Sequence, residues 1–461
     1  MNNAGAADKQ EGKRDNRPAK SNLPDLLISP VTRRCFMGCA AVAGTAVVGA
    51  AGIGVGIDGS LKRSHETTQA TENQEALKQL LLRSQEGPSG KRFPVLDLHS
   101  HPSMKAYMFR QRFWKTHESQ PSMSPISLVA DVDSLVNGGT GVFLCTAYVL
   151  EREFFSDVIP LRGLSKLHPR FHHMATAPLN VLAMEYLDKA EEMVAESNRR
   201  RGDIVQLAKS YSDMKRIVDE GKVCMLHAME GAHHLAGKTE LVDDFFTRGV
   251  CMMTVPHLYP NKAGGCVDIF SFLRESWWAK GSFSKKYQDN SGLSPWGHEL
   301  VEKLLDVGIV VDIVHGTQEY RKQIIDIAKN HPKKRPITMS HVDIHKNPAE
   351  GMGPSPEDVR AIADMGGVIG LMMARHSYRT SQDPVEAMLC AVDYLVKNGG
   401  EDVVAVGSDF DGYSSTPKGL ESPRDFGAVR RALLAKYTEE QTAKFLFGNG
   451  ERLLRMGWGK P

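Results

Sequence analysis

The chain has 461 residues, a formal net charge of +2, and 41% hydrophobic and 24% charged residues. This composition is typical of a globular protein long enough for one large domain or two medium ones. The near-neutral charge gives no electrostatic basis for binding nucleic acid, and we expect no nucleic-acid partner. Seven cysteines are scattered without a C-x-x-C pair, which argues against a disulfide framework. We expect the five beyond the N-terminal segment to be small core residues.

The N-terminal segment, residues 1–58, is not expected to belong to the folded domain. Residues 1–30 are polar and charged, as in disordered chains. The sequence TRRCFMG (32–38) and the uncharged Gly/Ala/Val run that follows it resemble a bacterial Tat export signal. This predicts that the segment engages the Tat export machinery and delivers the protein to the periplasm or cell envelope. A membrane anchor is the alternative, because the run approaches the roughly 20 residues that span a bilayer.

A polar linker follows at 59–92, with a short helix expected over 73–84, and beyond it short apolar runs alternate with helical stretches. The apolar runs are PVLDLH (94–99), GVFLCTAY (141–148), VCMLHAME (223–230), VCMMTVPH (250–257), GIVVDIVH (308–315), PITMSH (336–341), GVIGLMM (367–373) and DVVAVGSD (402–409). Amphipathic stretches lie at 179–200, 204–220, 294–307 and 317–330. Strands alternating with helices indicate a parallel sheet, and eight such units predict a (β/α)8 TIM-type barrel, a single catalytic domain over 93–461. An open doubly wound sheet is the alternative, but no G-x-G-x-x-G motif follows the first strand.

Polar side chains fall at the ends of six of these eight predicted strands. They are His99, His101, Glu230, His257, His315, His341 and Asp409. Each alone has an ordinary explanation as a capped or solvated residue. Active sites of barrels lie at the carboxyl ends of the strands, so a closed barrel would bring all seven to one mouth. His99 and His101 alternate with Ser100 and therefore point to the same face of their strand.

The residue types predict a metal centre. Imidazole and carboxylate without thiolate suit Zn²⁺, Mn²⁺, Co²⁺ or Fe²⁺. Six expected ligands exceed the three protein ligands of one catalytic zinc, which favours two metal ions, most simply two Zn²⁺. The expected ligands are His99, His101, Glu230, His315, His341 and Asp409. Glu230 is the candidate bridging carboxylate, a metal-bridging hydroxide the expected nucleophile, and Asp409 the expected proton acceptor.

At this point the sequence resembles the membrane (renal) dipeptidase family of the amidohydrolase superfamily. The segments that carry the resemblance are LDLHSHP (96–102), MEGAHHL (229–235), GLSPWGHELVEKLLDVGIVVDIVHG (292–316), MSHVDIH (339–345) and VGSDFDG (406–412). The resemblance implies a binuclear zinc barrel that cleaves dipeptides, and a homodimer. It implies one metal held by His99, His101 and Asp409, the other by His315 and His341, with Glu230 bridging. His257 matches the family histidine that contacts substrate and polarises the reacting carbonyl.

Two departures from the family pattern concern the metal and the substrate. The first family motif is usually H-x-D, whereas this chain has His99-Ser100-His101. The family also carries an arginine shortly after the sixth-strand histidine, which binds the carboxylate of the dipeptide. Here no arginine follows His341 before Arg360. Lys346 could serve as a point charge for substrate binding, but it cannot reproduce a bidentate clamp.

Other polar residues are weighed as secondary candidates. His227 is expected on the opposite strand face, packed against a helix, and His233 and His234 in a loop that shapes the site. Asp411 could support Asp409 or cap a loop. Candidates to line the mouth are His345, His376 and the aromatic-rich insertion at 268–290, which would form a lid or pack over the rim. No G-x-S-x-G motif is present, which argues against a covalent serine hydrolase.

Three functions remain open from the sequence. The first is a zinc-dependent dipeptidase. The second is an amidohydrolase or lactonase whose substrate lacks a free C-terminal carboxylate, which the absent arginine favours. The third is a non-catalytic metal-binding barrel, against which Glu230 and Asp409 argue, because a purely structural site needs neither a bridging carboxylate nor a proton acceptor.

Overall fold

The computed structural model describes residues 74–117, 126–268, 291–344, 353–373, 383–412 and 416–459. The predicted export signal and residues 59–73 of the linker lie outside these ranges. The short helix expected over 73–84 is present as α3 (Gln74–Ser84). Within the described ranges, no helix is both long enough and apolar enough to cross a membrane.

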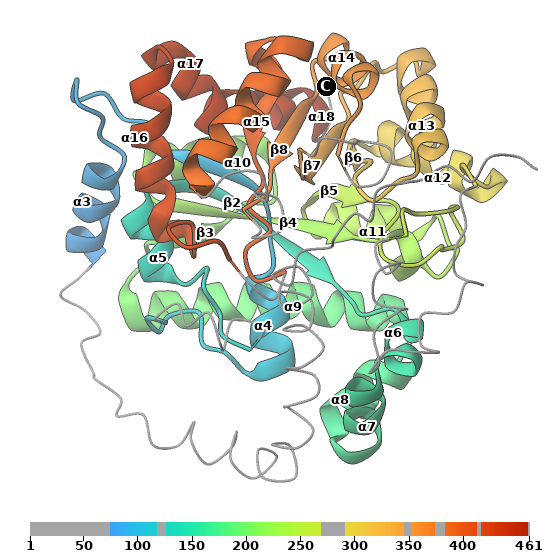
Figure 1. The fold of residues 1–461 in the computed structure, drawn as a ribbon. Coiled ribbons are helices and arrows are strands. Elements are labelled where there is room, and N and C mark those ends of the chain that lie inside the picture. Colours follow the sequence, from blue (N-terminus) through green and yellow to red (C-terminus); the bar gives the residue numbers. More distant parts are fainter. Residues whose placement is uncertain are drawn as a thin grey trace, which may run out of the picture.

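Eight parallel strands close into a barrel, which confirms the predicted fold (Figure 1). The strands are β1 (Val95–Ser100), β2 (Thr140–Tyr148), β4 (Val223–Glu230), β5 (Val250–Thr254), β6 (Val310–Asp312), β7 (Thr338–Val342), β8 (Val368–Leu371) and β9 (Val404–Val406). They neighbour one another in chain order, and pairing of β9 with β1 and of β2 with β4 completes the ring. Every residue of these strands is buried, as expected when helices cover a parallel sheet and apolar runs supply its strands.

Helices surround the barrel, and the predicted stretches at 179–200, 294–307 and 317–330 are confirmed as α9, α12 and α13. The helices are α4 (Pro102–Phe109), α5 (Val132–Gly138), α6 (Arg152–Asp157), α7 (Ile159–Leu167), α8 (Pro169–Thr176), α9 (Leu179–Arg201), α10 (Tyr211–Asp219), α11 (Leu241–Thr247), α12 (Pro295–Val307), α13 (Gln318–Asn330), α14 (Pro356–Asp364), α15 (Pro384–Gly399), α16 (Phe426–Lys436), α17 (Glu439–Ala443) and α18 (Asn449–Gly457). The short helices α6, α7 and α8 project together beyond one end of the long helix α9 (Figure 1).

One predicted element is wrong in part. The stretch 204–220 is not a single helix, because it begins with the short strand β3 (Val205–Leu207) and turns helical only at α10. Ser210 sets this boundary, since its side chain accepts a hydrogen bond from the Asp213 backbone N–H and caps the helix. β3 pairs with the start of β4, and β5 pairs with the end of the same strand, so β3 lies outside the ring.

Local sequence signals mark where α12 begins and ends before β6. Ser294 caps the start of α12 by accepting from the Gly297 N–H, with Pro295 as the first helical residue. Gly308 ends this helix with a φ of 94°, a left-handed conformation that favours glycine. The chain then enters β6 two residues later. His315 follows the other end of this strand by three residues.

The cysteines follow the prediction with one exception. Cys145, Cys224, Cys251 and Cys266 are buried and form no disulfide within the described residues, as expected for small core residues. Cys390 is exposed on α15, so its assignment to the core was wrong. Helix α15 is amphipathic. Its buried apolar residues face the barrel, whereas Cys390 lies on the outer face.

Candidate metal centre

The strands bring all seven predicted residues to the carboxyl-terminal mouth of the barrel. His99 and His341 lie near the ends of β1 and β7, and Glu230 is the last residue of β4. His101 follows β1 directly, whereas His257, His315 and Asp409 each follow their strand by three residues. Six of the seven are buried, and the Asp409 side chain is 14% exposed.

The Glu230 carboxylate occupies the centre of the cluster and contacts five imidazoles. Its Oε1 atom lies 3.4 Å, 3.3 Å and 3.6 Å from the Nε2 atoms of His99, His315 and His341. Its Oε2 atom lies 3.4 Å from the Nε2 atoms of both His101 and His257. Oε1 thus faces three imidazoles and Oε2 faces two, so the two oxygens of this carboxylate can serve different ions, as expected of a bridging ligand.

The spacing of the donor set is compatible with bound metal ions. Nε2 of His99 lies 3.0 Å from Nε2 of His101, and Nε2 of His315 lies 3.1 Å from Nε2 of His341. Two unprotonated nitrogens at this distance repel each other unless a cation lies between them. Ligands of a tetrahedral zinc with bonds of about 2.0–2.1 Å lie roughly 3.4 Å apart, which matches the spacing of the cluster. Three ligand triplets are close enough to hold an ion, namely His99/His101/Glu230, Glu230/His315/His341 and His99/His341/Asp409.

Burial and neighbouring charges set the protonation of the cluster. Burial lowers the pKa of His315 and, with the nearby His99, holds the pKa of His341 well below its usual range, which favours neutral rings. Burial alone would raise the pKa of Glu230, but His257 and His99 hold it well below its usual range. His315 and His341 are therefore favoured as neutral imidazoles and Glu230 as an ionised carboxylate, which are the ligand forms that metals bind, whereas Asp409 and Glu230 raise the pKa of His101 against the effect of burial.

Two of the site residues have strained backbones. His315 and Asp409 have φ values of 66° and 56°, in the left-handed region that residues other than glycine rarely adopt. Such outliers persist where the surrounding structure holds them and often lie at functional sites. At both positions the chain turns sharply after a strand, which directs the side chain back over the mouth.

Sequence reasoning missed Glu151, which supports His257. Glu151 Oε1 lies 2.9 Å from His257 Nδ1, and its Oε2 accepts a hydrogen bond from the Tyr148 hydroxyl at 2.6 Å. Burial would raise the pKa of Glu151, but His257 and His233 lower it to about 2. Conversely, burial would lower the pKa of His257, yet Glu230 and Glu151 raise it. His257 is thus held between two carboxylates.

A signal for Glu151 was present in the sequence. It follows the end of β2 by three residues, the same offset at which His257, His315 and Asp409 follow their strands. The predicted apolar run 141–148 ends before Glu151, so this position did not stand out as the end of a strand.

The secondary candidates divide into supporting residues and residues outside the described ranges. His227 lies on β4, 3.5 Å from Glu191 in α9, as the opposite-face prediction required. His233 and His234 both contact the backbone of Val149, the former 2.8 Å from its carbonyl oxygen and the latter accepting its N–H. They hold the segment between Tyr148 and Glu151 rather than joining the cluster.

Asp411 acts as a loop anchor, one of its two predicted roles. Its carboxylate accepts hydrogen bonds from the backbone N–H groups of Val129 and Ala130 at 2.8 Å and 3.0 Å. Lys346, His345, His376 and residues 269–290 of the predicted lid lie outside the described residues.

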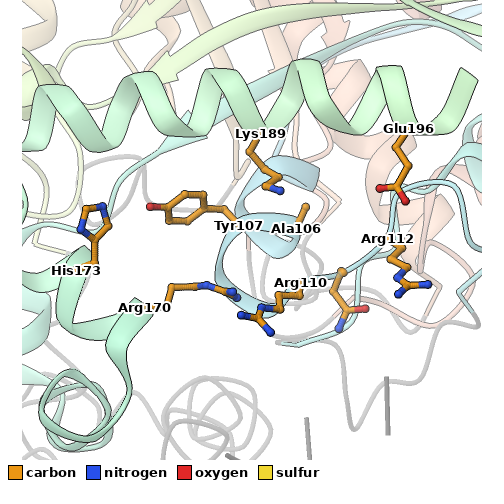
Figure 2. Close-up of a pocket in the computed structure, with 9 residues that line it drawn as sticks. Ala106, Tyr107, Arg110, Arg112, Arg170, His173, Lys189 and Glu196 are labelled. Carbon is orange, nitrogen blue, oxygen red and sulfur yellow. The ribbon is translucent and has the colours of Figure 1, made fainter. Parts of the chain in front are cut away.

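A separate hollow of about 620 Å³ opens between α4, α8 and α9 (Figure 2). Arg110, Arg170 and Lys189 are among its lining residues, and Tyr107 and His173 lie at one side of it. None of the seven clustered residues lines this hollow, so it is distinct from the barrel mouth.

Comparison with known proteins agrees with this geometry. The family model for membrane dipeptidase (peptidase family M19) matches residues 89–456. An uncharacterized protein in the pqqA 5′ region of Klebsiella pneumoniae is 25% identical over 287 residues, 61% of this chain and 97% of that protein. Dipeptidase tcpJ of Claviceps purpurea is 26% identical over 333 residues, 70% of this chain and 68% of that protein.

Solved structures show the same fold. A metallo peptidase from Rhodobacter sphaeroides, liganded with a phosphinate mimic of the dipeptide L-Ala-D-Ala, superposes with a TM-score of 0.60 at 19% identity. The match covers 79% of this chain and 99% of that one.

Fold and site together define a closed (β/α)8 barrel with a buried cluster of potential metal ligands at the carboxyl ends of its strands. Within that class, the chain belongs to the membrane dipeptidase family, peptidase family M19.

Proposed function

We propose that this protein is a zinc-dependent dipeptidase that holds two metal ions at the barrel mouth. The observation that carries the proposal is the Glu230 carboxylate, which lies at the centre of five imidazoles whose Nε2 atoms are 3.3–3.6 Å from its two oxygens. His99, His101, Glu230 and Asp409 would hold one ion. Glu230, His315 and His341 would hold the other. When bound, the two ions supply Lewis acidity and lower the pKa of water enough to yield a nucleophile near neutral pH.

Asp409 is suited to move a proton. Its Oδ1 atom lies 3.2 Å from His101 Nε2, and its side chain is more exposed than the other members of the cluster. In the proposed reaction it accepts a proton from the attacking water and passes it to the amine that leaves when the peptide bond breaks.

His257 is suited to bind the reacting carbonyl. The carboxylates of Glu151 and Glu230 raise its pKa against the effect of burial, so the imidazole can carry a proton on Nε2 while Nδ1–H donates to Glu151. A protonated Nε2 at the mouth would donate a hydrogen bond to the oxygen that gains negative charge in the transition state.

A second candidate, an amidohydrolase or lactonase acting on substrates without a C-terminal carboxylate, is favoured by one observation. Arg360, the first arginine after His341, lies on α14, where it is exposed and paired with Glu357 at 2.7 Å. It therefore does not replace the family's carboxylate-binding arginine. Lys346 remains the proposed substitute in substrate binding, as a single point charge.

Turnover of paired substrates separates the two candidates. The purified, zinc-loaded protein is assayed with an L-L dipeptide, an L-D dipeptide and the C-terminal amide of each. The dipeptidase proposal predicts that each free acid is cleaved with a higher kcat/KM than its amide. Equal or faster turnover of the amides would favour the second candidate. Glu230→Gln, which keeps the shape of the side chain, is the inactive control for both.

We also infer from the sequence alone that residues 1–58 carry a Tat-like export signal and that residues 59–92 link it to the barrel at 93–461. Fractionation of cells that express the chain, beside an Arg33→Lys/Arg34→Lys double variant, tests this. Export lost only in the variant supports the inference. The resemblance-based expectation of a homodimer is tested by light scattering of the purified protein.

A further inference from the structure

The side-chain hydroxyl of Ser340 joins three groups that belong to three different strands. Its Oγ atom lies 2.9 Å from Nδ1 of His341, 3.1 Å from Nδ1 of His99 and 2.6 Å from Oδ2 of Asp312. Ser340 and Asp312 are fully buried. A single hydroxyl thus contacts one imidazole from β1 and one from β7, both on the side of the ring opposite the Nε2 atoms that face Glu230.

Counting protons fixes the direction of these hydrogen bonds. A hydroxyl has one proton to donate and two lone pairs that accept. Oδ1 of Asp312 accepts hydrogen bonds from the backbone N–H groups of Ser340 at 3.0 Å and Val314 at 3.2 Å. Its Oδ2 lies 2.5 Å from the Thr254 hydroxyl and 2.6 Å from the Ser340 hydroxyl. Both distances are those of hydroxyls that donate to an ionised carboxylate.

We propose that Ser340 is a positioning residue that sets the tautomer of His99 and His341 together. Because Asp312 takes the only proton of the Ser340 hydroxyl, both imidazoles must donate to it from Nδ1–H. Each ring then has an unprotonated Nε2, the form that binds a metal. This inference rests on the proposed function in one respect, namely that His99 and His341 serve different ions, so that one hydroxyl tunes both halves of the centre.

Two variants change the hydrogen bonds of Ser340 in different ways. Ser340→Ala removes the hydroxyl that accepts from both rings, so Nδ1 of His99 and Nδ1 of His341 lose this hydrogen-bond partner. In Asp312→Asn the amide oxygen accepts the hydrogen bonds from the backbone N–H groups of Ser340 and Val314. The amide NH₂ then faces the Ser340 hydroxyl and donates a hydrogen bond to it. The Ser340 hydroxyl then donates to Nδ1 of one histidine, which forces the proton of that ring onto Nε2 and removes it as a ligand.

Thr338→Val is the matched control. Thr338 lies two residues earlier on the same strand, is fully buried, and donates its hydroxyl to the Val368 carbonyl at 2.7 Å. Its substitution also removes a buried hydroxyl from β7 but leaves Ser340 and Asp312 in place.

The experiment combines two readouts on the full chain. The ¹⁵N chemical shifts of the imidazoles in the metal-free protein report the tautomers, and Zn²⁺ titration against a chromophoric chelator reports affinity. In the wild type we expect His99 and His341 as Nδ1–H tautomers. We expect Ser340→Ala to weaken both zinc sites about 10- to 100-fold. We expect Asp312→Asn to weaken one site more than the other and Thr338→Val to weaken neither.

Wild-type Nε2–H tautomers at either ring, or unchanged tautomers and zinc affinities within twofold in Ser340→Ala, would overturn the inference. Circular dichroism and thermal unfolding of the metal-free proteins show whether each variant folds, and Ser340→Cys, a conservative replacement, provides a second variant if Ser340→Ala does not. The tautomer measurement needs neither zinc nor turnover. A wild type with the expected tautomers that binds no zinc would therefore refute the proposed function while leaving the role of Ser340 supported.

Discussion

Glu151 and His257 are 106 positions apart in the sequence, yet Glu151 Oε1 lies 2.9 Å from His257 Nδ1 at the barrel mouth. The pair joins the segments that follow β2 and β5. Because Glu151 also accepts from the Leu258 backbone N–H at 3.3 Å, it holds both the ring and the loop that carries it. The orientation of His257 therefore depends on a residue outside the cluster of predicted ligands.

Removing the charge of Glu151 should impair catalysis more than folding. Glu151→Gln keeps the shape of the side chain but no longer favours a protonated His257. We expect kcat/KM for a dipeptide to fall about 10- to 100-fold, mainly in kcat, with little change in zinc content. The control is Glu153→Gln in the first turn of α6, which should retain wild-type activity. An unchanged kcat in Glu151→Gln would contradict the proposed role of the pair.

The imidazole of His101 should be replaceable by a carboxylate but not by a methyl group. Nε2 of His101 lies within 3.4 Å of Glu230 and 3.2 Å of Asp409. His101→Asp introduces the residue type that the family usually carries, and we expect it to retain both zinc ions. His101→Ala should weaken one zinc site at least 10-fold in a chelator titration. Two intact sites in the alanine variant would show that His101 is not a ligand.

Glu191 should make the metal-free protein sensitive to acid. The His227 imidazole and the Arg248 guanidinium lower its pKa from 4.5 to about 2. A carboxyl whose folded-state pKa is depressed contributes stability that is present above pH 4.5 and is lost as the pH falls toward 2. We expect Glu191→Gln to lower the free energy of unfolding at pH 7 by about 0.5–1 kcal/mol, because the part-exposed site is screened by solvent.

Urea unfolding between pH 7 and pH 2.5 measures this contribution. The difference between the wild type and Glu191→Gln should shrink as the pH falls. The exposed neighbour Glu192 provides the control substitution, Glu192→Gln. A difference that stays constant across this range would refute the assignment to Glu191.

Arg430 should be a major structural contact between the C-terminal helices and the start of the barrel. Its guanidinium donates to the backbone carbonyls of Phe93, Ser84 and Gly138 at 2.8 Å, 2.6 Å and 2.9 Å. Burial lowers the pKa of Arg430 to about 10. Arg430→Met would fill similar space but leave three carbonyls without this donor, and we expect a loss of about 3 kcal/mol.

Thermal unfolding of the metal-free protein checks the Arg430 prediction. The control is Arg431→Met on the adjacent residue, which should leave the midpoint nearly unchanged. Equal effects of the two substitutions would show that the three carbonyl contacts contribute little.

The barrel and its cluster could be predicted because both depend on local pattern. Buried parallel strands are continuous apolar runs, and a polar residue at the end of such a run is conspicuous. His99, Glu230 and His341 lie within or at the end of their strands, where register alone directs them. β3 was missed because three residues beside a helix make too short a run to recognise.

The remaining features depend on contacts between distant segments. Glu151 reaches His257 only because the closed barrel brings the segments after β2 and β5 together, although β4 lies between the two strands. The left-handed backbones of His315 and Asp409 lie in a region that few residues other than glycine adopt, and no local sequence pattern marks either position. The tautomers that Ser340 sets likewise require three strands in register.

Metal stoichiometry against activity tests the central claim most directly. The full-length protein is stripped of metal, titrated with Zn²⁺, and assayed at each step for bound zinc and for hydrolysis of a dipeptide, with Glu230→Gln measured in parallel. The account predicts that activity rises to a plateau at two zinc ions per chain and that Glu230→Gln reaches neither the stoichiometry nor the activity. Full activity at one zinc ion or none, or two bound ions without dipeptide hydrolysis, would contradict it.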